Sequence, residues 1–99
     1  MELIDAQARH AATPTTFEVP SEADLAAIFV EDYVKIALTA PNIGAERFWV
    51  EVTSLENGAY RGKVSNDLVR FGNHYSYGDE ITFEAKHVMD IISTGAAAA

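Results

Sequence analysis

Three histidines are the residues of this chain that are best suited to acid–base chemistry, because their side chains titrate near neutral pH. They are His10, His74 and His87, and no two of them have the i, i+4 spacing of a helical metal pair. The sequence has neither an HExxH pattern nor a cysteine. We therefore predict no metal site, no cofactor and no thiol chemistry.

Two adjacent acidic pairs, Glu31-Asp32 and Asp79-Glu80, are the candidates for two-carboxylate chemistry. Neighbouring residues of a strand point to opposite faces, so neither pair brings its own carboxylates together. Both pairs stand at predicted strand starts, where a solvated turn explains them. The sequence also contains no G-x-S-x-G nucleophile elbow and no glycine-rich phosphate loop. We predict that the chain is not an enzyme; a small enzyme without a recognisable motif is the last of the alternatives.

Trp49 and a loop over residues 67–77 are the candidates for contacting a partner. Trp49 lies in a predicted strand whose alternation places it opposite the inward residues, beside Arg61, and Trp and Arg are enriched at binding hot spots. The loop is long, and its aromatic and polar composition is typical of recognition surfaces. The candidate partner-binding residues are Trp49, Arg61, Arg70, Phe71, His74, Tyr75 and Tyr77.

Both candidates also have a purely structural interpretation. The N-terminal segment or the 67–77 loop could cover Trp49, as small β domains often require. Phe71 and one tyrosine of the loop could close one end of a barrel. The sequence leaves these alternatives open.

The composition limits the kind of partner. The chain has 99 residues with 15 acidic and 7 basic side chains, which give a formal net charge of -8. Such an acidic chain is not suited to direct binding of nucleic acid. No apolar run approaches the roughly 18 residues of a membrane span, and the N-terminus lacks the pattern of a signal peptide. We expect a cytoplasmic protein whose partner is another protein, with no membrane contact.

Several periodic segments must position the candidate residues. Residues 1–20 are expected to form a peripheral N-terminal arm that includes a frayed helix within 2–12, and residues 93–99 a disordered tail. A single α+β domain is expected over 21–92. Ser21 predicts the start of one short helix over 22–29, because its hydroxyl can cap free backbone N–H groups. Alternation of apolar residues then predicts strands over 33–38, 47–53 and 81–83.

A hairpin around Asn57-Gly58 can be placed in register from its alternation. A two-residue turn there would pair Val52 with Lys63 and mix apolar and charged residues on each face. A three-residue loop over 56–58 avoids this mixing and predicts the pairs Val50–Val64, Glu51–Lys63 and Val52–Gly62. We therefore predict the three-residue loop, with Trp49 on the face opposite Phe48, Val50 and Val52.

The last apolar run, over residues 86–92, fits a helical turn and a closing strand equally well. Four or five short antiparallel strands behind one short N-terminal helix predict an α+β fold with a small, strongly bent sheet or a partly closed SH3-like barrel. An open meander with the helix across its core face is the alternative. The closed form is favoured because a chain of this size has little burial in reserve for exposed sheet edges.

Four segments together resemble a known family. They are residues 13–20 (TPTTFEVP), the run 46–53 (ERFWVEVT), the run 60–67 (YRGKVSND), and residues 77–83 (YGDEITF) with 87–91 (HVMDI). In this order and spacing they are similar to the bacterial YegJ-like domain of unknown function family. The resemblance covers about residues 12–92. The chain departs from the family pattern at Leu68, where a proline is common, and at Glu31-Asp32, where a Gly-Asp turn is expected.

The resemblance implies a compact α+β domain with a hairpin-rich sheet, and it implies no activity, cofactor or catalytic residue. Some similar small domains act as immunity or accessory proteins. We predict a non-enzymatic, acidic protein-binding module of bacterial or phage origin. The alternative is an acidic antagonist, of the immunity or anti-defence type, that blocks a basic surface of a nucleic-acid-handling protein.

Overall fold

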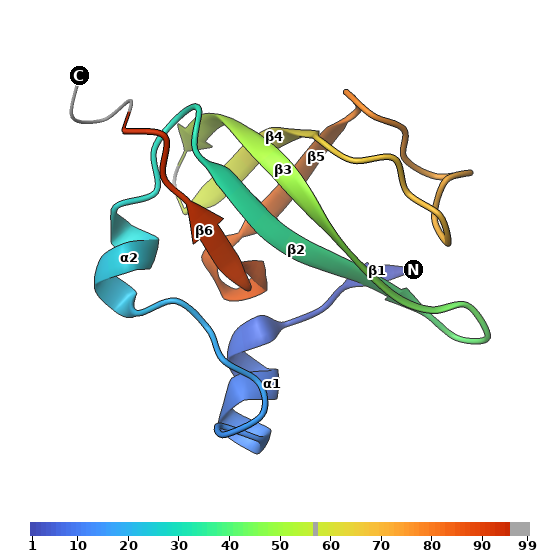
Figure 1. The fold of residues 1–99 in the computed structure, drawn as a ribbon, viewed down its shortest axis with the longest axis horizontal. Helices are drawn as coiled ribbons and strands as arrows, with labels where there is room; N and C mark the ends of the chain where they lie inside the picture. Colours follow the sequence, from blue (N-terminus) through green and yellow to red (C-terminus); the bar gives the residue numbers. More distant parts are fainter. Residues whose placement is uncertain (57, 96–99) are drawn as a thin grey trace.

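A single curled antiparallel sheet forms the centre of the structure (Figure 1). The computed structural model describes residues 1–56 and 58–95. The strands follow the order β1-β2-β3-β4-β5, and β6 pairs with the same edge of β2 as β1 does. The predicted α+β class with a strongly bent antiparallel sheet is confirmed. The strands are β1 (Glu2–Leu3), β2 (Tyr33–Ala40), β3 (Gly44–Glu56), β4 (Ala59–Val64), β5 (Glu80–Glu84) and β6 (Asp90–Ile92).

The main core lies on the concave face of this sheet. The predicted alternation holds in β2 and β3: the apolar residues of period two are buried, and the residues between them are exposed or half-buried except Ala37, which belongs to a second buried cluster. Phe71 from the long loop, Val88 and Ile28 close the core from outside the sheet. The main-core residues that β2 to β5 contribute are Val34, Ile36, Leu38, Phe48, Val50, Val52, Val64, Ile81 and Phe83.

The β3–β4 hairpin corrects one prediction. The pairs Val50–Val64, Glu51–Lys63 and Val52–Gly62 are present as predicted, but the register shifts beyond Val52. Thr53 is left unpaired as a bulge, and Glu56 pairs with Ala59, so the three-residue loop was wrong; its middle residue, Asn57, lies outside the described residues. An extra residue in the strand, as a bulge, and an extra residue in the loop give the same alternation up to Val52. The bulge has the further effect of increasing strand twist, which suits a curled sheet.

Two short helices precede the main strands: α1 (Ala6–Ala12), within the segment where a frayed helix was expected, and α2 (Glu22–Ala26). Ser21 caps α2 as predicted, since its Oγ accepts a hydrogen bond from the backbone N–H of Asp24 at 3.1 Å. The helix ends earlier than predicted, at Ala26. The N–H of Phe29 donates instead to the carboxylate of Asp32 at 3.0 Å, which draws the chain out of the helix.

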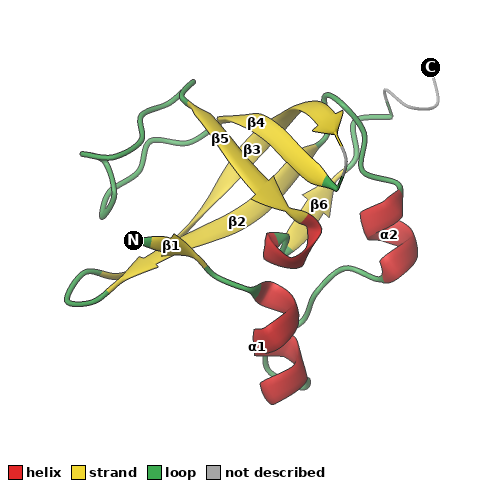
Figure 2. Ribbon diagram, turned by 180° about the vertical axis from the view of Figure 1, so that it is seen from behind, coloured by secondary structure: helices red, strands yellow, loops and turns green. Residues whose placement is uncertain are grey.

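The N-terminal segment packs on the convex side of the sheet, so it is not the peripheral arm that was predicted (Figure 2). Ile4 and Ala6 are buried against Ala37 of β2 and Met89. Phe17 and Val19 cover the same cluster from the connection between the two helices. The sequence pattern hid this contact because only a few small or isolated apolar residues make it.

The C-terminal segment forms a helical turn and then a strand, the two structures between which the sequence did not decide. The 3-10 helix η1 (Ala85–His87) comes first, and β6 then pairs with β2. Thr94 was expected in a disordered tail, but its N–H donates to Asp32 Oδ1 at 3.1 Å, and residues 96–99 lie outside the described residues. Asp32 is therefore buried, at 2 % exposure, and not in the solvated turn that was predicted.

Candidate functional site

The convex side of the sheet carries the most distinctive group of charged and aromatic side chains. We call the outer face seven charged or aromatic residues of β2, β3 and β4 that point away from the main core. Acidic and basic residues alternate across its strands, since Glu51 of β3 pairs with Lys63 of β4, which pairs in turn with Glu80 of β5. The outer face consists of Tyr33, Lys35, Arg47, Trp49, Glu51, Arg61 and Lys63.

Trp49 lies half-buried in the middle of the outer face. The β2–β3 register places Lys35 directly opposite it, and the Lys35 Nζ lies 5.0 Å from the centroid of the indole. An ammonium over a tryptophan ring is held by the electrostatic attraction of the ring face. The backbone around Trp49 is fixed as well, because its N–H donates to Asn66 Oδ1 at 2.6 Å. The indole is outside the main core, as expected, and it is half-buried beside Lys35.

A second cation, Arg47, lies two residues before Trp49 on the same face of β3. Its Cζ is 5.7 Å from the centroid of the Phe17 ring, which the N-terminal segment contributes. His10 donates from Nδ1 to the carbonyl oxygen of Phe17 at 2.6 Å and so fixes that residue from α1. Two consecutive outward residues of β3 thus take part in cation–aromatic contacts with different neighbours.

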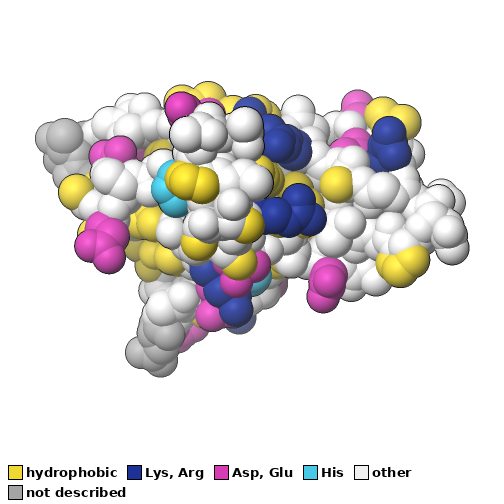
Figure 3. Space-filling view, turned by 90° about the horizontal axis from the view of Figure 1, so that it is seen from below, with side chains coloured by type: hydrophobic (Ala, Val, Ile, Leu, Met, Phe, Trp, Pro, Cys, Tyr) yellow, Lys and Arg dark blue, Asp and Glu magenta, His cyan; other side chains and the backbone are white. Residues whose placement is uncertain are grey.

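A hollow of about 630 Å³ separates the N-terminal segment from this part of the sheet. Residues 15–20 form one wall, and Lys35 and Arg47 form part of the other. Asp24 and Asp90 also line it, so its charge is mixed. Figure 3 shows dark blue Lys and Arg side chains near the middle of one face of the molecule, with magenta acidic side chains on several sides of them.

The loop between β4 and β5 is anchored by a residue that the sequence analysis did not single out. The Glu46 carboxylate accepts backbone hydrogen bonds from Val69 at 2.7 Å, Arg70 at 2.7 Å and Phe71 at 3.1 Å. Partial burial raises the pKa of Glu46, but these three N–H groups and the nearby Arg70 charge outweigh it and lower the pKa below its ordinary value. Glu46 therefore holds one turn of the loop in place as a carboxylate.

The predicted loop residues have different environments. Phe71 is fully buried in the main core, which corrects its assignment as a partner contact: it closes one end of the curled sheet. Tyr75 is half-buried against the same core, and the exposed His74 ring stands edge-on to Phe71 with centroids 6.0 Å apart. Arg70 is exposed and donates to the Ile43 carbonyl at 2.8 Å. Tyr77 is 68 % exposed and remains available for contact.

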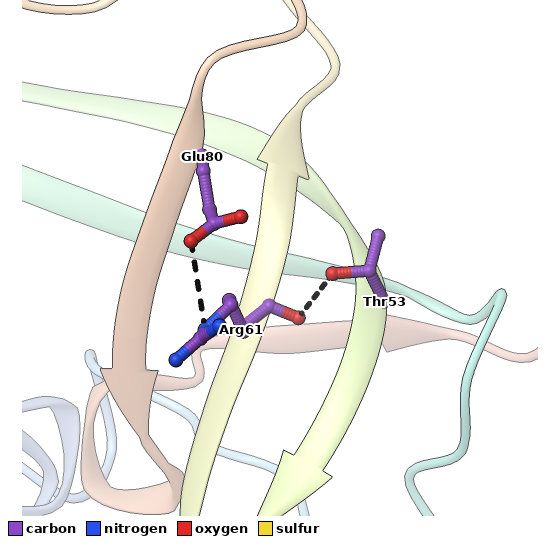
Figure 4. A network of polar contacts seen from close by, with 3 residues as sticks. All are labelled: Thr53, Arg61 and Glu80. Carbon is purple, nitrogen blue, oxygen red and sulfur yellow. Dashed lines mark hydrogen bonds and ion pairs between the residues drawn. The ribbon is translucent and has the colours of Figure 1, made fainter.

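Arg61 belongs to the outer face at its β4 side (Figure 4). Its Nε lies 3.5 Å from Glu80 Oε1, and its carbonyl oxygen accepts a hydrogen bond from Thr53 Oγ1 at 3.1 Å. Both side chains of the ion pair are more than half exposed, so the pair is screened by water and stabilises the fold little.

The structure thus divides the seven predicted residues between two places. Trp49 and Arg61 lie on the outer face, whereas Arg70, Phe71, His74, Tyr75 and Tyr77 belong to the loop. Lys35 and Arg47 were missed, although pairing the first two strands in register would have placed Lys35 opposite Trp49. Glu46 gave no sequence signal, because its partners are 23 to 25 residues away.

No family model, curated protein or solved structure significantly matches this chain. The resemblance to the YegJ-like family therefore stays a prediction. Within residues 1–56 and 58–95, no group of three or more potential metal-ligating side chains comes together. None of the helices in the same residues has the length and apolar character needed to cross a membrane.

Proposed function

We propose that this chain is a non-enzymatic protein-binding module whose outer face contacts the partner. The observation that carries the proposal is the position of Trp49, which is half-exposed on a hydrogen-bonded sheet and makes a cation–π contact with Lys35. A rigid aromatic residue beside a cation offers a large contact area with little loss of side-chain entropy on binding. The neighbouring Arg47 and Arg61 extend the same kind of surface along the sheet.

The distribution of acidic residues supports this module over the acidic antagonist. An antagonist of a basic surface requires acids gathered on one side of the molecule. At least five of the 15 acids accept hydrogen bonds from the backbone of their own chain: Asp5, Asp32, Glu46, Asp79 and Asp90. On the face that Figure 3 shows, the acidic side chains stand on several sides of the view and do not form one patch.

Comparing two aromatic substitutions tests the proposal. Trp49→Ala is expected to stay folded by circular dichroism and to retain less of a partner captured from a lysate of the native host. Phe29→Ala, which removes a 45 % exposed aromatic residue from the connection between α2 and β2, is the matched control and should retain the partner. Lys35→Glu should weaken capture without removing any ring.

Equal capture by wild type and both outer-face variants would overturn the proposal. Unfolding of Trp49→Ala would do so as well, because the indole would then be a core residue. Capture at low and high salt separates the two functions: an antagonist held by net charge releases its partner as salt rises, whereas contacts through a stacked indole persist.

A further inference from the structure

β5 is the terminal strand of the sheet and has one unpaired edge. In the described part of the chain it pairs with β4 alone. The opposite end of the sheet differs, because the edge of β2 that does not pair with β3 is already hydrogen-bonded. The Lys35 carbonyl accepts from the Met89 N–H at 2.8 Å, and the Ala37 carbonyl accepts from the Ile4 N–H at 2.9 Å. A bare strand edge is a template for pairing with another chain.

The hydrogen bonds identify which groups of β5 point outward. Val64 donates to the carbonyl of Asp79 at 2.9 Å, and residues of an antiparallel pair alternate between bonded and non-bonded positions. In this register Ile81 and Phe83 bond to β4, so the N–H and C=O groups of Glu80, Thr82 and Glu84 face away from the sheet. The N–H of Glu84 agrees with this direction, because it donates to His87 Nδ1 and not to β4.

The side chains of these same three residues are exposed and lie on the convex side of β5. The cross-strand row Glu51–Lys63–Glu80 alternates acid, base and acid, and it ends on an acid at the free edge. Glu84 closes the other end of the strand; its carboxylate takes part in the capping box of η1 and makes no ion pair within the described residues, whereas Glu80 lies beside Arg61 in an exposed ion pair. An added strand would therefore meet carboxylates at two positions four residues apart.

This charge pattern disfavours a second copy of the chain as the occupant. If β5 paired antiparallel with its own copy about Thr82, each Glu80 would stand opposite a Glu84, and like charges directly opposite destabilise a strand pair. We propose that β5 binds an extended basic segment of another protein as an added antiparallel strand, with Lys or Arg opposite Glu80 and Glu84. The proposal names the partner class of the protein-binding function above and rests on it.

The fold sets the length of the added strand. The N–H of Glu84 is already bonded to His87, where η1 begins, so pairing ends at the Glu84 carbonyl. At the other end the Gly78 N–H donates to Val64 at 2.7 Å as the loop turns away. The segment that fits has a basic residue, three β-forming residues and a second basic residue.

Titration of the ¹⁵N-labelled chain with a blocked Lys-Val-Thr-Val-Lys peptide tests the proposal directly. The largest amide shifts are expected at Glu80 and Thr82, whose N–H groups gain acceptors. A Glu-Val-Thr-Val-Glu peptide should bind much more weakly. Glu84→Gln should lower the affinity for the basic peptide by about two- to fivefold, the effect of losing one cross-strand charge pair. Glu22→Gln on α2 should leave that affinity unchanged.

Two further changes isolate the backbone contact. Thr82→Pro removes an N–H that points away from β4 and should weaken binding about tenfold, whereas Thr82→Val keeps that N–H and should bind within about twofold of wild type. Should the proline perturb the strand, N-methylation of the peptide's central threonine removes the matching donor with the protein unchanged, and it should weaken binding to the same degree.

The inference is overturned if the basic peptide shifts no β5 amide, if the acidic peptide binds equally well, or if the N-methylated peptide binds as tightly as the parent. The capture experiment with Trp49→Ala does not use this edge. A failure at β5 is therefore distinguishable from a failure of the protein-binding function itself.

Discussion

The Glu46 carboxylate accepts a hydrogen bond from the backbone N–H of Arg70 at 2.7 Å, across 24 residues of sequence. Two neighbouring N–H groups, from Val69 and Phe71, share the same carboxylate. This contact fixes the turn that delivers Phe71 into the core. It explains how the long loop is held so that Phe71 closes one end of the sheet.

Removal of this carboxylate should loosen the loop. We expect Glu46→Ala to lower the free energy of unfolding by about 1–3 kcal/mol, because three N–H groups lose a charged acceptor. Urea denaturation measures the loss, and hydrogen exchange should accelerate at residues 69–71. Asp67→Asn, an exposed change in the same loop, is the control and should leave both measurements unchanged. Equal exchange rates in Glu46→Ala and wild type would contradict this account.

The stability of the fold should decrease in mild acid through His87. Burial lowers the pKa of His87 below its ordinary value of 6.5, although Glu84 and Asp5 oppose this effect. The unfolded chain then binds the proton more readily than the folded chain does. The stability that the neutral His87 side chain contributes is therefore complete above about pH 6.5, and it is lost as the pH falls toward the pKa of the folded state. Protonation of Nδ1 would also remove the acceptor for the Glu84 N–H.

Urea midpoints at about pH 7.5 and 5.5 measure this effect. His87→Gln should flatten the pH dependence, because no proton can bind at that position. His74→Gln, which changes an exposed histidine, should keep the wild-type dependence. The same slope in wild type and His87→Gln would show that His87 does not contribute.

Gly62 is required by close packing between β3 and β4. A Cβ at this position would lie 2.4 Å from Val50 Cγ1 and 2.5 Å from the Glu51 carbonyl oxygen. Because the second atom belongs to the backbone, it cannot move away without disturbing the strand pair. We expect Gly62→Ala to cost about 3 kcal/mol in urea denaturation, whereas the exposed Lys63→Ala should cost less than about 1 kcal/mol. A neutral Gly62→Ala would show that the strands are further apart than described.

Asp32 should be the most sensitive of the acidic residues. Its buried carboxylate accepts backbone hydrogen bonds from Phe29 at 3.0 Å and from Thr94 at 3.1 Å. Asp32→Ala leaves both donors without this acceptor and should cost about 2–3 kcal/mol. Thr94→Ala, which keeps the backbone N–H, should cost less than half as much. Thermal unfolding of the two variants compares them, and equal midpoints would contradict the anchoring of the C-terminal segment by Asp32.

The sequence was sufficient for what depends on local periodicity. Alternation in β2 and β3 predicted that Val34 and Val50 enter the core and that Trp49 does not, because side chains of a strand alternate strictly. The same argument could not decide between a bulge at Thr53 and a longer loop, since each adds one residue to the same hairpin and leaves the pairing up to Val52 unchanged.

Contacts between distant segments were beyond the reach of periodicity. The three donors to Glu46, and Thr94 as a donor to Asp32, belong to segments whose sequences show no period. The packing of the N-terminal segment on Ala37 rests on Ile4 and Ala6, which form no stripe long enough to detect. In each case one polar or small residue satisfies a partner that only the folded chain brings near.

The emission of Trp49, the single tryptophan of the chain, tests the central claim most directly. Acrylamide quenching is measured on the free protein and on its complex with the captured partner, with the partner's own emission subtracted. If the outer face is the contact surface, the indole is quenched in the free protein and protected in the complex. Unchanged quenching on binding would place the partner elsewhere and contradict the proposed function.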